Sequence, residues 1–225
     1  MFATLRRGRD NEPGTYDRDV YVPRFNALED SDEVRALVAT VGSAQLLTVG
    51  EDGYPLATLL PVIWDDTRLV FHFARANPHW HSIEPGSPGL AVVTGPEAYV
   101  SPAWYPSKAE HGRVVPTWNY SAVQFRGRVT VHDDAEWLRT AVTRLTELHE
   151  EVRSQPWSVG DAPAPYVEKQ LRAIVGVELV IESVEAKAKL SQNRSAEDRE
   201  GVVAGLLREG SGREEAVANA MQELP

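Results

Sequence analysis

Apolar residues recur at helical spacing in two stretches of the chain, which predicts two amphipathic helices. The first helix is expected at residues 32–41 and ends before Gly42. The second is expected at residues 137–152, with Asp133 and Asp134 at its N-terminus. Weaker helical patterns occur at residues 78–83, 166–174, 196–208 and 213–224.

Elsewhere the apolar residues follow strand patterns. About eight short strands are expected, at residues 44–49, 55–64, 67–73, 90–94, 97–101, 114–120, 122–132 and 175–184. Gly95 and Pro96 separate two of them, and residues 102–113 have the composition of a loop. Numerous short antiparallel strands usually close into a barrel. The expected fold class is therefore α+β dominated by β, a barrel with flanking helices.

Composition excludes several classes of protein. The 225 residues are 42% hydrophobic and 25% charged, as in ordinary globular domains, and no apolar run is long enough to span a membrane. Cysteine is absent, which excludes disulfides and thiol chemistry and fits a cytoplasmic location. The patterns of Rossmann and P-loop nucleotide sites are also missing.

The formal net charge of −10 argues against direct binding of duplex DNA. Three segments, at residues 67–83, 101–130 and 186–194, depart from this acidic average. They combine cations, amide or hydroxyl donors and aromatic rings, which are the groups that bind a phosphorylated planar ligand. Solvated loops around a Trp/Tyr core would explain any one segment. Three such segments in an acidic chain favour a binding site.

The first of these segments is the most specific. An apolar strand ends just before Arg75, and Pro78 suits the start of a helical turn. Free N–H groups at such a turn bind anions. This arrangement predicts a phosphate cradle.

Six blocks of sequence carry a resemblance to a known family. They are YVPRF from Tyr21, HFARANPHW from His72, YVSP from Tyr99, WYPSK from Trp104, VPTWNY from Val115 and KLSQNR from Lys189. With them the chain resembles, over roughly residues 20–207, the PaiB-type FMN-binding family, described as negative transcriptional regulators of protease synthesis and sporulation. The resemblance implies a split β-barrel related to pyridoxamine-phosphate-oxidase-like flavoproteins. It also implies a homodimer with its FMN sites where the subunits meet.

The resemblance also implies roles and boundaries. Arg75 and Asn77 would hold the FMN phosphate, with Lys108 as a second candidate for that charge. Trp118, Asn119 and Tyr120 would line the isoalloxazine pocket. The residues expected to reach the cofactor or the partner subunit are Lys189, Ser191, Gln192, Asn193 and Arg194. For each residue the alternative is a structural hydrogen bond, or core packing for Trp118. A flexible extension at 1–18, an FMN-binding split-barrel domain at 19–210 and a C-terminal helix or tail at 211–225 are expected.

Two other functions are compatible with these residues. The haem-dependent piperazate synthases, which form an N–N bond, resemble distant members of the same family, so the pocket is also a candidate site for haem b. One imidazole would then be the axial ligand, from His72, His79 or His81. A transcriptional regulator without catalysis is the second alternative. No proton-transfer pair can be assigned, which is compatible with flavin chemistry because the ring carries the electrons.

Overall fold

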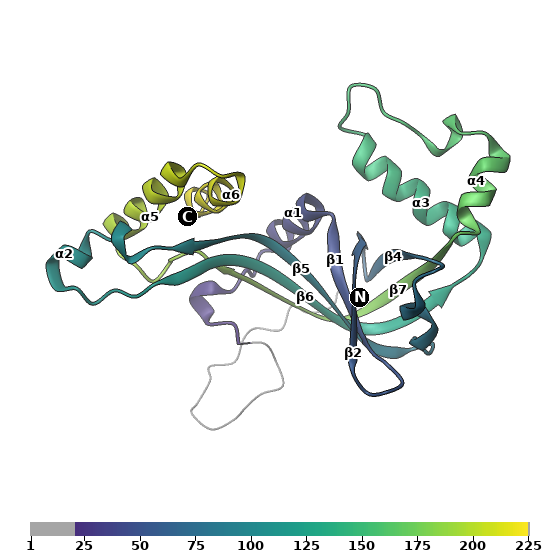
Figure 1. Cartoon of the computed structure of the whole chain (residues 1–225), viewed down its shortest axis with the longest axis horizontal. Helices are drawn as coiled ribbons and strands as arrows, with labels where there is room; N and C mark the ends of the chain where they lie inside the picture. The colour runs from purple at the N-terminus through teal and green to yellow at the C-terminus, as the bar shows by residue number, and fades with distance from the viewer. Residues whose placement is uncertain (1–20, 225) are drawn as a thin grey trace. The chain divides into compact units, whose positions relative to one another are not determined.

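The computed structural model describes residues 21–224, and the predicted extension at 1–18 lies outside them. The helical segments (Figure 1) are η1 (Arg24–Asn26), α1 (Ser31–Val41), η2 (Pro78–Ser82), η3 (Pro102–Trp104), α2 (Ser107–His111), α3 (Ala135–Glu150), η4 (Val159–Asp161), α4 (Ala164–Leu171), α5 (Ala196–Glu209) and α6 (Gly212–Gln222). The strands are β1 (Ser43–Val49), β2 (Pro55–Pro61), β3 (Ile63–Asp65), β4 (Arg68–Ala74), β5 (Ser87–Val100), β6 (Thr117–His132) and β7 (Ile174–Lys189). No helix in this part of the chain is long and apolar enough to cross a membrane.

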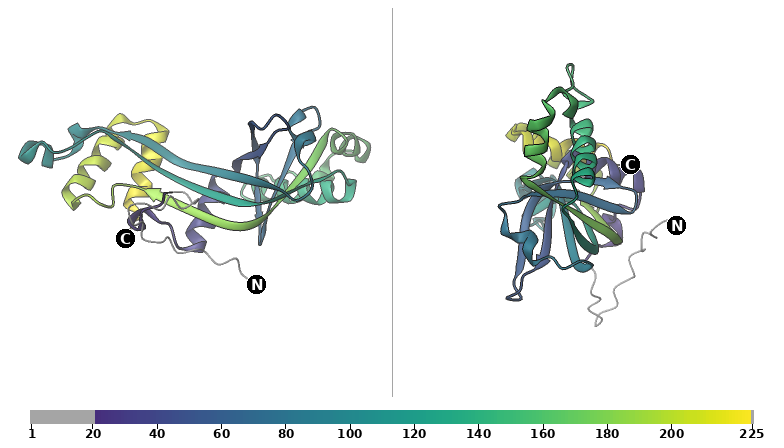
Figure 2. Two further views of the ribbon diagram at one scale, coloured as in Figure 1. Left: turned by 90° about the horizontal axis from the view of Figure 1, so that it is seen from below. Right: turned by 90° about the vertical axis from the view of Figure 1, so that its right-hand side faces the viewer.

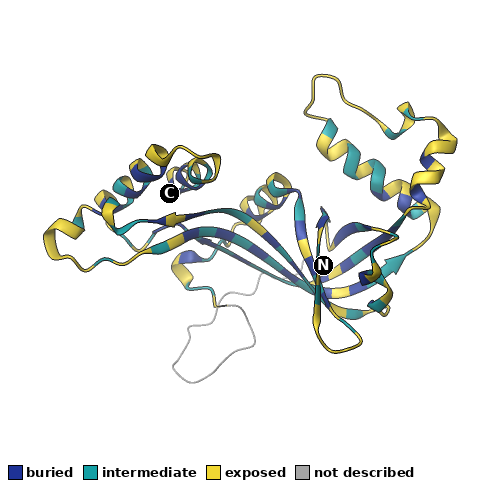
Figure 3. Cartoon of the chain, in the orientation of Figure 1, coloured by how far each residue is buried: buried dark blue, intermediate teal, exposed yellow. Residues whose placement is uncertain are grey.

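The strands form one seven-stranded sheet in the order β2-β1-β5-β6-β7-β4-β3. β1 and β2 pair as an antiparallel hairpin, with Leu47 opposite Ala57. β4 pairs antiparallel with β7, with Phe71 opposite Val177. Buried and less buried residues alternate along the strands, as the colour bands in Figure 3 show. Where this alternation holds, the strand has one core-facing side, whereas β4 buries three consecutive residues, Leu69, Val70 and Phe71.

The expectation of about eight short strands was wrong, because three strands are long and uninterrupted. β5 has 14 residues and runs straight through Gly95 and Pro96. β1 pairs with β5 only at residues 90–92, so a proline at position 96 removes no hydrogen bond of that ladder. A Cβ at Gly95 would lie 2.8 Å from Leu37 Cδ1, which explains the glycine by close packing. β6 likewise unites two expected strands, and β7 continues to Lys189.

The described chain divides into two compact units, to which β5, β6 and β7 all contribute. The first unit comprises residues 38–93 and 124–184, and the second unit comprises residues 21–37, 94–123 and 185–224. In the first unit, α3 and α4 lie side by side (Figure 2, right), and Leu138, Val167 and Leu171 pack together between them. In the second unit, α5 and α6 bury Val202, Leu206, Val217 and Met221 against residues of β5 and β7.

The helix predictions hold with small shifts in boundaries. Asp134 accepts backbone N–H groups of Glu136 and Trp137 as the N-cap of α3. Ser195 caps α5 in the same way. The expected loop at 102–113 instead contains η3 and α2, and the Ser107 hydroxyl donates to buried Asp198 at 2.7 Å. A partner on a distant helix thus orders a segment whose own composition predicts a loop.

Candidate functional site

One side of the strands in the second unit carries rings and ammonium groups. The buried side of β6 and β7 there includes Asn119, Ser121, Ala186 and Ala188. Residues at the intervening positions project to the opposite side, because side chains alternate along a strand. They form the aromatic–lysine face, defined here as Tyr99, Trp118, Tyr120, Lys187 and Lys189. The face brings together two of the three basic segments.

The side chains of this face approach one another closely, although they come from distant parts of the sequence. The rings of Tyr99 and Trp118 meet edge to face with centroids 6.1 Å apart, and Trp118 is 48% exposed. Core packing, the alternative for Trp118, therefore does not describe it. Lys187 Nζ lies 5.3 Å from the centroid of the Tyr120 ring. A flat molecule would find accessible ring surface on this face.

Lys189 is anchored on the same face. Its Nζ donates to the Thr117 hydroxyl and, at 2.6 Å, to the Trp118 carbonyl oxygen. Burial lowers the pKa of Lys189 below its ordinary value, the nearby Tyr120 raises it, and the positive charges of Lys187 and Arg194 lower it further. The face therefore concentrates positive charge that an anionic group would relieve.

The N-terminal YVPRF block reaches this face, which sequence reasoning did not foresee. Lys187 Nζ donates to the Tyr21 carbonyl oxygen at 3.2 Å and lies 5.6 Å from the Tyr21 ring centroid. The backbone of Leu28 donates to Ala186, so this segment runs along β7. Lys187 and Tyr21 were not among the predicted site residues. The alternating sequence Glu-Ala-Lys-Ala-Lys before the KLSQNR block was the signal available for Lys187.

Three predicted site residues make structural hydrogen bonds on the buried side. Asn119 is fully buried, and its Nδ2 donates to Ser191 Oγ at 3.0 Å and contacts Met221 Sδ at 3.3 Å. Ser191 has a φ of +64°, which its side-chain bonds to Asn119 help to hold. Gln192 accepts from the backbone N–H of Leu190 at 2.7 Å. These contacts close the turn after β7, and the cofactor roles of these residues stay predictions.

The other predicted residues of the second unit lie at or near the surface. Asn193 and Lys108 are exposed, Lys108 in the short helix α2. Arg194 Cζ lies 4.8 Å from the ring centroid of Tyr105, whose side chain is buried in the core of this unit. Arg194 is thus placed by a cation–π contact. The positive charge of Arg194 nevertheless contributes to lowering the pKa of Lys189.

Arg75 and Asn77 belong to the first unit, where Arg75 already has partners. Its guanidinium forms a two-pronged ion pair with Asp133. It also donates to the carbonyl oxygens of Arg172 at 2.8 Å and Ile174 at 3.0 Å. The hydrogen bond to Arg75 holds the pKa of Asp133 below its usual range. The phosphate role of Arg75 stays a prediction, and it would place a phosphate in competition with Asp133.

The predicted helical turn after Arg75 is present, but one of its N–H groups is not free for an anion. Asn77 is the N-cap of η2, and its side chain accepts from the His79 backbone N–H at 3.0 Å. His79 is buried, with Nε2 2.9 Å from Thr48 Oγ1 and Nδ1 2.8 Å from Thr58 Oγ1. Both ring nitrogens of His79 are therefore occupied, so binding of a haem iron by His79 would displace one threonine hydroxyl.

The two remaining haem-ligand candidates have other surroundings. Burial lowers the pKa values of both His72 and His79. His72 lies on β4 and is half-buried. His81 stacks on Trp80 with ring centroids 3.6 Å apart. These neighbours do not select one imidazole as an axial ligand.

Comparison with known proteins identifies the family. Residues 20–183 match the family model described as "Putative FMN-binding domain". The protease synthase and sporulation protein PAI 2 of Bacillus subtilis is 30% identical over 208 residues, which cover 91% of this chain and 97% of that protein.

Solved structures show the fold. The FAD and haem binding protein of Mycobacterium smegmatis superposes with a TM-score of 0.54 at 20% identity, covering 80% of each chain. The flavocytochrome Anf3 of Azotobacter vinelandii has a TM-score of 0.53 at 16% identity, covering 73% of this chain and 70% of that chain. The expected α+β split β-barrel with flanking helices is confirmed. The chain belongs to the PaiB-like family of FMN-binding domains.

Proposed function

We propose that this protein binds FMN and that the aromatic–lysine face receives the flavin. The observation that carries the proposal is the gathering of Trp118, Tyr120 and Lys189 on one accessible side of the strands in the second unit. Membership of an FMN-binding family supports the identity of the ligand.

The residues present fit the chemistry of a flavin. The rings of Tyr99, Trp118 and Tyr120 supply stacking area for a planar ring system. Lys187 and Lys189 supply positive donors for carbonyl oxygens or phosphate. Bound FMN would supply one- and two-electron redox chemistry, while these side chains bind and orient it.

Two roles follow for a protein that holds FMN in this way. The first is electron transfer to an unidentified small molecule. The second is a response to flavin or redox state, in line with the name of the Bacillus subtilis relative, which refers to protease synthesis and sporulation. With a net charge of −10, a regulator of this composition is better suited to a protein or small-molecule partner than to duplex DNA.

We further propose that the protein is a homodimer. The outer side of the β1–β2 hairpin exposes apolar residues, including Val49 at 60%, Tyr54 at 72% and Leu59 at 61% exposure. β2 also forms one edge of the sheet. An exposed apolar strand at the edge of a sheet tends to associate or aggregate with other chains. A second copy of this chain would cover it. Light scattering should give about twice 24.9 kDa, and Leu59→Arg should shift the mass toward the monomer.

Haem is the second candidate ligand. Two solved structures of this fold are named for a haem protein and a flavocytochrome. In this chain His79 is engaged by two threonines and His81 by Trp80. At His79 these contacts favour FMN, since a haem iron could bind this imidazole only by displacing a threonine hydroxyl.

An absorbance spectrum of the purified protein tests the proposal. Flavin bands, or their appearance when FMN is added to saturation, support it. A single intense Soret band would replace it with the haem alternative. Failure to retain either group would leave a binding or regulatory protein that acts without a cofactor, and the proposal would be abandoned.

A further inference from the structure

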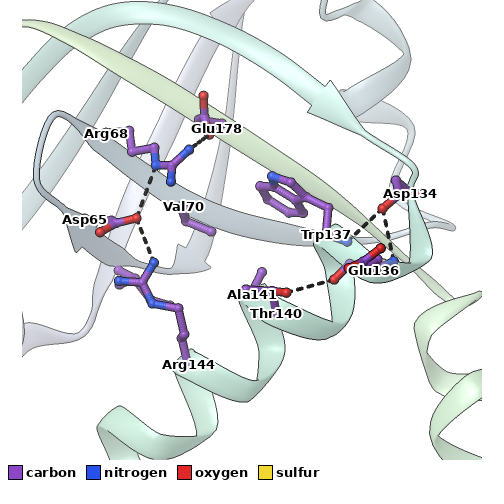
Figure 4. A pocket seen from close by; sticks show the side chains of 11 residues that line it. Asp65, Arg68, Val70, Asp134, Glu136, Trp137, Thr140, Ala141, Arg144 and Glu178 are labelled. Carbon is purple, nitrogen blue, oxygen red and sulfur yellow. Dashed lines mark hydrogen bonds and ion pairs between the residues drawn. The ribbon is translucent and has the colours of Figure 1, made fainter.

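A cavity of about 320 Å³ lies in the first unit and contains none of the residues proposed for FMN (Figure 4). Its walls come from the β3–β4 hairpin, β7 and α3. A cavity of this size is at the lower end of those that hold small molecules. Its lining separates into two charged ends and an apolar middle.

The first end is a chain of alternating charges. Arg68 donates through Nε to Asp65 and through Nη1 to Glu178, at 3.2 and 2.9 Å. Arg144 Nη1 donates to the same Asp65 oxygen at 2.7 Å. Asp65 and Glu178 therefore fix both guanidinium groups. Among the described residues, Nη2 of Arg68 and both Nε and Nη2 of Arg144 have no partner, so N–H groups are left for a carboxylate.

The second end lies at the start of α3. Asp134 uses one oxygen to cap the helix, accepting from Glu136 and Trp137 backbone N–H groups at 3.1 and 2.8 Å. The Glu136 carboxylate is exposed and makes no hydrogen bond or ion pair within residues 21–224. The cavity lining as a whole carries four carboxylates and two guanidinium groups, a net charge of −2. This excess of negative charge favours a cationic group of the ligand near Asp134 and Glu136, at the start of α3.

The middle of the cavity is apolar. Val70 and Ala141 belong to a small hydrophobic cluster that Trp137 joins. The Trp137 ring is fixed by stacking on His132, with centroids 4.3 Å apart. Figure 4 shows Arg68 and Arg144 at one end, Asp134 and Glu136 at the other, and Trp137 between them.

We propose that this cavity binds a small zwitterion whose carboxylate and ammonium group lie at opposite ends of an apolar body, the chemistry of an ω-amino carboxylic acid. The carboxylate of the ligand binds the open N–H groups of Arg68 and Arg144. Its ammonium group lies at Asp134 and Glu136. Its apolar body packs on Val70, Ala141 and Trp137.

Isothermal titration of the full chain with three matched probes tests this. 6-Aminohexanoate carries its two charges at opposite ends of a methylene chain, hexanoate lacks the ammonium group, and hexylamine lacks the carboxylate. 6-Aminohexanoate should bind, and each analogue should bind at least about tenfold more weakly, because each loses one charge-assisted interaction. Absence of 6-aminohexanoate binding at millimolar concentration, or equal binding of the amine alone, would overturn the proposal.

Variants on α3 locate the site. Arg144→Gln and Glu136→Gln should each weaken 6-aminohexanoate binding by about tenfold or more. Arg139→Gln is the matched control, since Arg139 lies on the same helix but does not line this cavity. Equal affinities for the Arg144 and Arg139 variants would place any binding elsewhere and refute the assignment. FMN titration of the same samples tests the flavin proposal independently of this one.

Discussion

Lys189 Nζ lies 2.6 Å from the main-chain carbonyl oxygen of Trp118. This contact joins the ends of β6 and β7 and fixes a partly buried ammonium group beside an exposed indole. Both residues come from blocks that resemble the FMN-binding family, and their side chains share one face of the second unit.

Removing this ammonium group should weaken FMN binding. Lys189→Met keeps the apolar stem and removes the charge, which should cost about 1.5–3 kcal/mol, or roughly ten- to 150-fold in dissociation constant. Flavin fluorescence titration measures the change. Lys169→Met, an exposed lysine on α4, controls for the loss of one positive charge. If the two variants bind FMN alike, Lys189 does not contact the flavin.

Arg75 offers a paired test of the phosphate prediction. If phosphate competes with Asp133 for this guanidinium, Arg75→Ala should weaken FMN by about tenfold or more, and Asp133→Asn should tighten it. The dissociation constants of both variants are measured by the same titration. Unchanged FMN affinity in both, together with a lower melting temperature, would assign Arg75 to the structural ion pair alone.

Asn119 should matter for stability. Asn119→Ala leaves the Ser191 hydroxyl buried with one fewer partner, so the free energy of unfolding should fall by about 1–3 kcal/mol. Urea denaturation measures this change. A variant of unaltered stability that no longer binds FMN would instead place Asn119 in the cofactor site.

Gly127 is a packing constraint between two long strands. A Cβ there would lie 2.0 Å from the carbonyl oxygen of Val180. The main chain of a strand cannot move aside as the end of a flexible side chain can. Gly127→Ala should therefore cost about 1–3 kcal/mol or more. Gly160→Ala is the control, because its nearest neighbour would be the Ser158 hydroxyl at 3.6 Å. Equal unfolding midpoints for the two variants would contradict this account.

Stability should depend on pH through His79 and His72. Burial depresses both pKa values in the folded chain, so between the ordinary value of about 6.5 and the lowered value only the unfolded state binds the proton. The free energy of unfolding should be highest above about pH 6.5 and should fall as the pH drops below it.

His79→Gln isolates one of these two contributions. The slope of unfolding free energy between pH 5 and 6.5 should be shallower in the variant, by at most about 1.4 kcal/mol per pH unit. The carboxylates with lowered pKa values, among them Asp65 and Asp133, contribute mainly below that window. An unchanged slope would mean that His79 takes up its proton equally in both states.

The sequence by itself determined most of the helices and the division of each strand into two sides. Alternation separates Asn119 from Trp118 and Tyr120, because the side-chain period of a strand is two. Only tertiary packing decided which side faces the core, since it buries Asn119 and leaves Trp118 exposed. Caps such as Asp134 and Ser195 are also local, since they bond to backbone groups within three residues. The family blocks were enough to imply the fold.

Tertiary structure alone decided which of these groups meet. Arg75 finds Asp133 58 residues away, and Asn119 finds Ser191 72 residues away. A long strand replaced two expected short ones because β5 continues beside β6 in the sheet, despite the local breaking tendency of Gly95 and Pro96. Periodicity reports only a residue's own element, whereas strand pairing and helix packing bring distant charges to one place. The functional surface therefore depends on contacts that no local pattern in the sequence records.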